Sequence, residues 1–263
     1  MGNSVAAFAL ERLGVQVLAM PTVLYGRRPD RGRPGGGPMP ASLLGSMLEG
    51  LRDDGRLASV DAVFSGYVAV PEQIAIIVEA ADKVRAVNRE AVFVVDPIMG
   101  DTETGRYVPQ DVVDGIVATL APAADVIMPN AWEMALIAGV ADTSLTAMRQ
   151  ACRKLGKPAL VSSIDTPDGI GVLYGAPTGD WLVETARLPR APKGTGDLLA
   201  ALFLGRRLSG QAPAVALEAA VASVHDVIVR ALASESDDLP LPAAQDLLVD
   251  PMTWVNARSL GVL

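Results

Sequence analysis

The chain has 263 residues, a formal net charge of −8, 50% hydrophobic residues and 20% charged residues. This composition excludes a disordered chain, and the acidic balance argues against a general nucleic-acid binder, since phosphate backbones are bound by dense Lys and Arg. No uncharged apolar stretch reaches the roughly 18 residues that cross a bilayer. The single Cys152 excludes a disulfide framework or a zinc cluster, and Met1-Gly2-Asn3-Ser4 is unlike a signal peptide. We therefore expect a soluble, cytoplasmic protein with small-molecule partners.

In chain order, short apolar runs alternate with longer amphipathic ones, which is typical of a parallel sheet covered by helices. Brief runs of β-branched or small residues predict strands at residues 15–19, 62–65, 92–95, 125–128 and 159–162. Helical spacing of apolar residues predicts helices at residues 4–13, 41–51, 71–88, 110–120, 132–138, 145–155, 198–208 and 214–232. We expect Asn3 or Ser4 to cap the first helix and Gly14 to end it.

The last elements complete the predicted architecture. Residues 169–174 and 181–185 flank a turn rich in Gly, which predicts an antiparallel hairpin at the edge of the sheet. Residues 240–263 are expected to form a helix and a tail that reaches a dimer partner. Because no repeat or linker divides the chain, we predict a single α/β domain over residues 1–263 with a mostly parallel central sheet.

One segment has low complexity. Residues 26–38 place Arg27, Arg28, Arg31 and Arg33 among glycines and prolines. This composition is not expected to form a regular element and predicts a mobile surface loop. Two interpretations stay open: a solvated loop, or an active-site lid that brings positive charge to a phosphate.

The most informative motif is Gly194-Thr195-Gly196-Asp197, directly before a predicted helix. Two glycines let the backbone pass close to a ligand, and the first amides of a helix attract an anion such as a phosphate. A carboxylate in the first turn, Asp197, can accept a proton from a hydroxyl that attacks phosphorus. The alternative is that Thr195 or Asp197 only caps the helix.

Other polar residues follow predicted strands, where open α/β sheets bind ligands. Asp96 and Asp101 follow the third strand and could hold a magnesium ion. Asn130 and Glu133 follow the fourth strand with N-x-x-E spacing, which puts both in one helical turn near nucleotide phosphates. The alternative for this pair is a helix cap with an acid favoured by the helix dipole.

Two aromatic or basic residues have simpler interpretations. Tyr67, at the end of the second strand in Ser65-Gly66-Tyr67, could cover a flat substrate, although a lone tyrosine there more often serves packing. His225 is the one histidine and lies inside a long apolar helix, so we interpret it as structural.

Together these motifs resemble the pyridoxal kinases of the ribokinase superfamily, from Gly2 to about Leu232. The likeness rests on many short stretches in the right order: Gly2-Asn3-Ser4, Phe8, Arg12-Leu13-Gly14, Thr22-Val23, Ser65-Gly66-Tyr67, Asp96-Pro97-Ile98-Met99-Gly100-Asp101, Tyr107-Val108-Pro109, Pro129-Asn130, Glu133 and Gly194-Thr195-Gly196-Asp197. The resemblance implies a ribokinase-like three-layer α/β/α sandwich. It also implies transfer of the ATP γ-phosphate to the 5'-hydroxymethyl of pyridoxal, giving pyridoxal 5'-phosphate.

The resemblance also assigns roles. Asp197 would be the base, and the amides of Gly194, Thr195 and Gly196 would stabilise the transferred group. Three residues would organise magnesium and the ATP phosphates: Asp96, Asn130 and Glu133, with Asp96 and Glu133 as the metal residues. The nucleotide side would be lined by Asp101, Tyr107, Ser162 and Thr195. The substrate side would be lined by Thr22, Tyr25, Tyr67 and Asp197. By the same likeness we expect a homodimer. Potassium dependence and the use of pyridoxine or pyridoxamine stay open.

The chain departs from the family pattern at three places. Family members carry a first strand and a ring-contacting serine before the Gly-Asn motif, so we expect the natural start to lie upstream of Met1. Pro29 stands where the family has a hydrogen-bonding threonine, and Lys193 stands where an apolar residue is expected. Two alternative functions follow: a hydroxymethylpyrimidine kinase of the same superfamily, or a non-catalytic protein that binds a vitamer or nucleotide.

Overall fold

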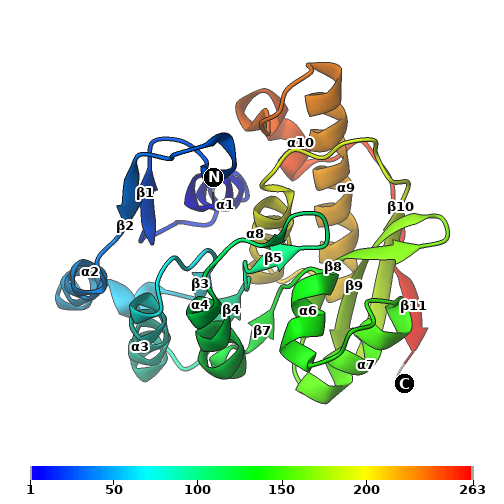
Figure 1. Ribbon diagram of the computed structural model, residues 1–263. Helices are drawn as coiled ribbons and strands as arrows, with labels where there is room; N and C mark the ends of the chain where they lie inside the picture. The colour runs from blue at the N-terminus through cyan, green and yellow to red at the C-terminus, as the bar shows by residue number, and fades with distance from the viewer. Residues whose placement is uncertain (1, 262–263) are drawn as a thin grey trace. The chain divides into compact units, whose positions relative to one another are not determined.

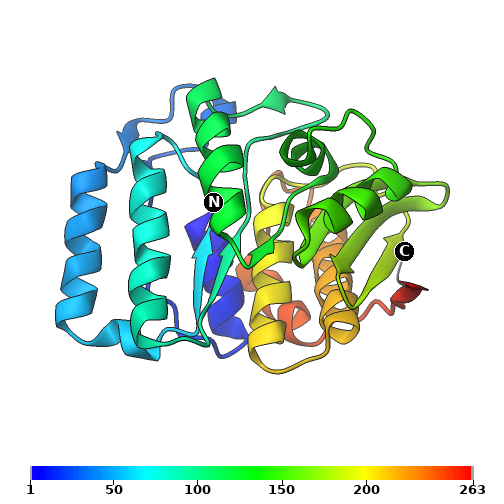
Figure 2. The ribbon, with the colours of Figure 1, turned by 90° about the horizontal axis from the view of Figure 1, so that it is seen from below.

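The computed structural model describes residues 2–261, and the chain forms two compact units. Unit 1 comprises residues 1–18 and 128–263, and unit 2 comprises residues 19–127. Figures 1 and 2 show both as mixtures of helices and strands. The single domain expected over residues 1–263 stays a prediction.

Unit 2 contains the parallel part of the sheet. Its strands β3 (Ala62–Ser65), β4 (Val92–Val95) and β7 (Val126–Ile127) pair in parallel, with β4 in the middle. The helical segments are α2 (Ala41–Asp53), α3 (Glu72–Val87), α4 (Gln110–Gly115), a π-helical turn (Ile116–Leu120), α5 (Ala121–Ala123), and the 3₁₀ turns η1 (Pro29–Arg31) and η2 (Arg56–Ser59). Two small antiparallel pairs complete it: β1 (Val23–Tyr25) with β2 (Gly36–Pro38), and β5 (Gly100–Asp101) with β6 (Gly105–Arg106).

The core of unit 2 explains these elements. Phe93, Val94 and Val95 of β4 are all at most 1% exposed, as expected of a strand that is covered on both faces. Helices α2 and α3 pack side by side (Figure 2), with Leu48 and Val84 buried between them and the strand ends. The apolar faces of these helices therefore match the sequence pattern that predicted them.

Unit 1 contains the antiparallel part. Strands β8 (Ala159–Thr166), β9 (Gly169–Ala176), β10 (Gly179–Thr185) and β11 (Arg258–Gly261) pair in this order. The helices are α1 (Asn3–Arg12), α6 (Ala131–Ala138), α7 (Leu145–Leu155), α8 (Thr195–Leu208), α9 (Pro213–Ala233) and α10 (Gln245–Val249), with the 3₁₀ turn η4 (Leu241–Ala244). The last six residues of β9 are buried, because α7 packs against this strand and so does α9 (Figure 1).

Close packing of α1 on α8 depends on a glycine. A Cβ atom at Gly205 would lie 2.8 Å from Leu13 Cδ1 and 3.3 Å from Leu10 Cδ2, so a larger residue would push the two helices apart. In the described part of the chain, no helix is long and apolar enough to cross a membrane.

The structure corrects four expectations. Residues 15–19 are described and form no strand; the Val15 amide donates to Leu10 O (3.0 Å), which ends α1 and makes no sheet ladder. A β-branched run forms a strand only where a neighbouring strand accepts its hydrogen bonds. The cap of α1 is also wrong, because Gly2 occupies the N-cap position and the structure records no side-chain cap bond there within residues 2–261.

The other two corrections concern residues 26–38 and the edge of the sheet. Residues 26–38 are partly regular, since η1 lies inside them and β2 pairs with β1 through Tyr25 and Gly36. Gly36 has a φ of +77°, and a Cβ there would lie 1.9 Å from Leu24 O, so the hairpin requires this glycine. At the other end, the expected helix in residues 240–263 is present, and the described part of the tail pairs with β10 as β11. The β9–β10 hairpin is therefore not at the edge of the sheet, where the sequence predicts it, because β11 covers it. Contact of the tail with a dimer partner stays a prediction.

A buried ion cluster holds β11 in place. Asp180 on β10 is 0% exposed, and its Oδ2 accepts hydrogen bonds from Arg149 Nε (2.8 Å) and Arg153 Nη2 (2.9 Å). Arg149 Nη2 also donates to Leu260 O (2.9 Å) on β11. One carboxylate therefore orients the arginine that binds the last strand.

We expect Asp180→Asn to lower the free energy of unfolding by about 3 kcal/mol, because removing one charge of a buried ion pair leaves its partners uncompensated. The matched control is Asp165→Asn, which removes the exposed ion pair with Arg187 and should cost at most about 0.5 kcal/mol. Urea unfolding of both variants measures the difference. Equal, small losses would show that the buried cluster contributes no more than a surface pair.

Candidate active site

The Gly-Thr-Gly-Asp motif forms the start of α8. Gly194 is the N-cap residue with a φ of +98°, and Leu198 N donates to its carbonyl (3.0 Å). Because the cap residue is glycine, Thr195 and Asp197 fall inside the helix, and neither makes a side-chain cap bond in the described structure. The helix-cap interpretation is therefore wrong here. The first-turn amides lie at the positive end of a 14-residue helix, where an anion is favoured.

Asp197 lies in the first turn of α8 and is largely shielded from water. Burial raises its pKa to about 6, and a hydrogen bond from the Gly2 backbone lowers the pKa in part. A carboxylate with a pKa near neutral pH is ionised at physiological pH and still accepts a proton readily. Its environment suits a general base.

The space beside the motif is open at Gly196. A Cβ atom there would meet no atom of the described chain within 4 Å, and the helix does not need glycine at this position for its backbone. The absence of a side chain at Gly196 leaves room for a ligand to approach the first-turn amides.

Asn130 and Glu133 form a capping box at the start of α6. Asn130 Oδ1 accepts from Glu133 N (3.0 Å), and Glu133 Oε2 accepts from Asn130 N (2.9 Å). Glu133 is only 3% exposed. The cap interpretation is thus confirmed for this pair, and it fixes the carboxylate of Glu133 beside the strand end.

Ser162 lies next to this cap. Its amide donates to Pro129 O (3.0 Å), and it forms a parallel bridge with Asn130. The β8–β9 register shifts between Val161 and Ile164, and Ser163 adopts a φ of +59° in this bulge. No residue pattern in the sequence predicts this strained backbone, and Ser162 lies beside Asn130 where β8 leaves its regular ladder.

In unit 2, Asp96 follows β4 and is 6% exposed. Its amide donates to Ser65 O (2.8 Å), which ties the ends of β4 and β3 together. The hairpin of β5 and β6 then brings Asp101 and Tyr107 together, with the Tyr107 hydroxyl donating to Asp101 Oδ2 and Thr104 N donating to Asp101 Oδ1 (2.6 Å). Two of the residues expected on the nucleotide side are therefore direct neighbours.

The residues expected on the substrate side also gather in unit 2. Thr22 Oγ1 donates to Tyr67 O (2.6 Å), which joins the start of the β1 hairpin to the loop after β3. Burial, and next the nearby Tyr25, raises the pKa of the Tyr67 hydroxyl. The structure thus brings Thr22, Tyr25 and Tyr67 together.

Sequence reasoning missed Gln73, whose side chain is 0% exposed. Its amide group bonds to the backbone of Ala69, Thr22 and Met39. The one available signal was a polar residue just after Pro71 at the start of a predicted helix, and that position is usually exposed.

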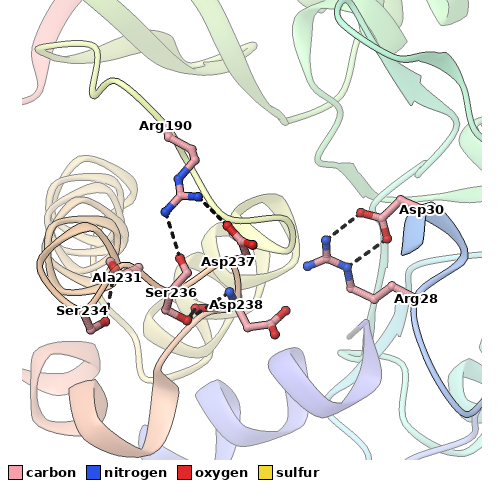
Figure 3. Close-up of polar contacts among 8 residues, drawn as sticks. All are labelled: Arg28, Asp30, Arg190, Ala231, Ser234, Ser236, Asp237 and Asp238. Atoms are coloured by element: carbon pink, nitrogen blue, oxygen red, sulfur yellow. Dashed lines mark hydrogen bonds and ion pairs between the residues drawn. The ribbon is translucent and has the colours of Figure 1, made fainter. Parts of the chain in front are cut away.

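The arginine-rich segment has its own charge balance. Arg28 donates to both carboxylate oxygens of Asp30, from Nε (3.0 Å) and Nη2 (2.6 Å) (Figure 3). Arg27 Nε donates to Arg33 O (2.9 Å). The hydrogen bond from Arg28 lowers the pKa of Asp30. Asp30 therefore offsets the charge of Arg28, so the positive charge that a lid could offer a phosphate is smaller than the four arginines indicate.

The segment before the glycine motif is also held. Arg190 pairs with Asp237 and donates to Ser236 O (3.5 Å), and Ser236 Oγ donates to Asp238 O (2.7 Å) (Figure 3). These bonds attach the chain that leads to Gly194 to the loop after α9. His225 lies on α9 and contacts Thr253 Oγ1 (3.3 Å), which fits its structural interpretation.

Comparisons with known proteins show what the whole chain is similar to. The family model described as phosphomethylpyrimidine kinase matches residues 12–241. A pyridoxal kinase of Rubrobacter xylanophilus is 36% identical across 99% of this chain and 93% of its own length. A pyridoxal kinase of Pseudomonas fluorescens is 34% identical across 98% and 93%.

Solved structures show the same fold. Pyridoxal kinase from Leishmania donovani in complex with ADP and pyridoxamine has a TM-score of 0.92 at 23% identity, covering 99% of this chain and 95% of that one. Pyridoxal kinase from Entamoeba histolytica has a TM-score of 0.91 at 19% identity, covering 99% and 94%.

These likenesses establish a ribokinase-like α/β fold and confirm the fold class expected from the sequence. The relatives that are 34% and 36% identical then show the family within this fold. The chain belongs to the pyridoxal kinases, within the family whose model is described as phosphomethylpyrimidine kinase.

We expect the desolvated Asp197 carboxylate to lower the free energy of unfolding, and we expect Asp197→Asn to restore it. The Asp197 carboxyl has a raised pKa in the folded state, so stability falls as pH rises from about 4 to about 6, and the cost persists above. We expect Asp197→Asn to be more stable by about 1–3 kcal/mol at pH 8 and equal to wild type near pH 4. Thermal unfolding at both pH values measures this. A variant less stable at pH 8 would contradict the raised pKa.

The two glycines of the motif should differ in what they contribute. Gly194→Ala should lower stability by about 1–2 kcal/mol, because the left-handed φ is unfavourable for L-residues. Gly196→Ala should keep the melting temperature of the free protein. It should lower the apparent affinity for ATP at least tenfold, because a methyl group would fill the open space. Thermal shift with and without ATP distinguishes them. Unchanged ATP binding in Gly196→Ala would remove the anion site from this turn.

Proposed function

We propose that this pyridoxal kinase transfers the γ-phosphate of ATP to the 5'-hydroxymethyl oxygen of pyridoxal, giving pyridoxal 5'-phosphate and ADP. The observation that carries the proposal is a half-buried carboxylate with a raised pKa, Asp197, in the first turn of a helix that begins at an open glycine turn. The family to which the chain belongs supports the substrate.

Each group in the motif has a role in the transfer. Asp197 accepts the proton of the hydroxyl as its oxygen attacks the γ-phosphorus, and the bond from phosphorus to the bridging oxygen of ADP breaks. The amides of Gly194, Thr195 and Gly196 bind the oxygens of the transferred group and stabilise their charge. This arrangement supplies positioning and electrostatic stabilisation, which phosphoryl transfer mostly requires.

The donor chemistry fits magnesium. Asp96 and Glu133 are both buried carboxylates, and Mg²⁺ is usually held by one or two carboxylates together with substrate phosphates and water. Within residues 2–261 no group of three or more acidic, His or Cys side chains is placed to hold a metal by itself. When bound, Mg²⁺ would neutralise phosphate charge, and the cap at Asn130 would hold Glu133 in place. Asp101, Tyr107 and Ser162 would line the nucleotide side.

Substrate recognition is proposed for Thr22, Tyr25 and Tyr67. The half-buried Tyr67 ring, held through its backbone by Thr22, would cover the pyridine ring. Structures of the Leishmania donovani relative contain pyridoxamine or pyridoxine beside ADP, which supports acceptance of these vitamers too. We further propose a cytoplasmic homodimer, on the resemblance alone, and light scattering after gel filtration would test its mass.

The test is formation of pyridoxal 5'-phosphate from pyridoxal and Mg-ATP. Wild type should be active, and Asp197→Asn should lose about 10²–10⁴-fold in kcat, because general-base catalysis contributes that much. ATP binding, followed by thermal shift, should be largely kept. Because Asp197 must be ionised, kcat should fall as pH drops through about 6.

Hydroxymethylpyrimidine is the control substrate, since the matching family model carries the pyrimidine kinase description. Turnover of hydroxymethylpyrimidine without turnover of pyridoxal would assign the chain to the pyrimidine reaction. A fully active Asp197→Asn enzyme would remove Asp197 from the role of base.

A further inference from the structure

A buried amide in unit 2 joins three segments that are distant in sequence. Gln73 is 0% exposed, and every polar atom of its side chain is used. Oε1 accepts from Ala69 N (3.0 Å), while Nε2 donates to Thr22 O (2.7 Å) and to Met39 O (2.9 Å). One side chain therefore satisfies three backbone groups.

These three segments frame the proposed substrate residues. Thr22 directly precedes β1, which carries Tyr25, and Met39 directly follows β2, so both ends of the β1–β2 hairpin bond to the same amide nitrogen. Ala69 lies two residues after Tyr67. Met39 N also donates to Thr22 O (2.8 Å), which closes the base of the hairpin.

The contacts continue from Gln73 to the aromatic side chain. Gln73 binds the carbonyl of Thr22, and the hydroxyl of Thr22 donates to Tyr67 O (2.6 Å). Gln73 also accepts a hydrogen bond from the amide of Ala69, two residues after Tyr67. The loop that carries Tyr67 is thus attached at two points, to the hairpin through Tyr67 O and to Gln73 through Ala69 N.

The bonding pattern requires an amide side chain. Two backbone carbonyls need two donors and one backbone N–H needs an acceptor, and the carboxamide of glutamine offers both. A glutamate would keep the acceptor and direct a carboxylate at two carbonyl oxygens. A methionine of similar volume would remove the Gln73 bonds of Ala69 N and Met39 O, at about 1–3 kcal/mol each. Thr22 O would keep its bond from Met39 N.

We propose that Gln73 is a positioning residue for the pyridine-binding side of the enzyme. It sets the distance between the hairpin that carries Tyr25 and the loop that carries Tyr67, and it does so without touching substrate. This inference rests on the proposed function, since it assigns these residues to pyridoxal. Its consequence is selective: loss of Gln73 raises the KM for pyridoxal and leaves the KM for ATP unchanged.

The experiment compares Gln73→Met and Gln73→Glu with wild type, at a temperature well below the melting point of each. We expect both variants to raise the KM for pyridoxal at least tenfold, with the KM for ATP within twofold of wild type. The matched control is Asn88→Leu, which removes another amide that donates to a backbone carbonyl in unit 2, at Val60 O (2.9 Å). This control should lower the melting temperature and leave both KM values unchanged.

The outcomes distinguish failure of the proposed function from failure of the positioning role of Gln73. A wild-type chain that does not phosphorylate pyridoxal would overturn the proposed function, whatever the variants do. An active wild type with an unchanged KM for pyridoxal in folded Gln73 variants would overturn the positioning role. If neither variant folds, Gln73→Asn, which keeps the amide on a shorter stem, is measured in the same way, and failure of all three to fold would assign Gln73 to stability alone and overturn the proposal.

Discussion

The left-handed backbone at Gly194 determines where α8 begins, and the position of the proposed base follows from it. With the N-cap at Gly194, Asp197 falls in the first turn, and the amides before it lie at the positive end of the helix. Close packing of α8 against α1 through Gly205 then fixes the helix within unit 1. A change at Gly194 would displace the base and the anion site together, because both belong to the same turn.

Asp180 and Asp197 differ in how the protein compensates their charge. Asp180 is fully buried and balanced by two arginines, so it contributes to stability through β11. Asp197 is shielded from water and its pKa is raised, because its stabilising contacts do not balance its desolvation. Charge that is poorly compensated in the folded state is typical of functional sites, and here it distinguishes the catalytic candidate from the structural one.

Much of the fold could be predicted from the sequence, because periodicity and turn residues act locally. The ranges of β3, β4 and α7 agree with the expected ones, and the hairpin of β9 and β10 lies at its glycine turn. The failure at residues 15–19 has a different origin, since a strand depends on a partner that local pattern does not specify. The return of the tail as β11 depends likewise on Arg149, more than a hundred residues earlier in the chain.

The candidate site was predicted where single motifs determine it. Gly194 and Asp197 lie within one four-residue motif, and the pairing of Asn130 with Glu133 follows from their spacing on one helical turn. Gln73 could not be predicted, because its role arises from backbone groups at Thr22, Met39 and Ala69 that meet only after folding. The bulge at Ser163 could not be predicted either, because no residue type there indicates a left-handed φ.

The capping box at Asn130 has a consequence for interpreting genetic variants. Glu133 both completes the cap of α6 and carries a proposed metal role, so an allele that loses this residue would lose two properties at once. A glutamine keeps an oxygen that accepts from Asn130 N and removes the charge, whereas an alanine removes both. Alleles encoding glutamine and alanine at position 133 would therefore form a graded series, in which the first reports charge alone and the second reports charge together with folding.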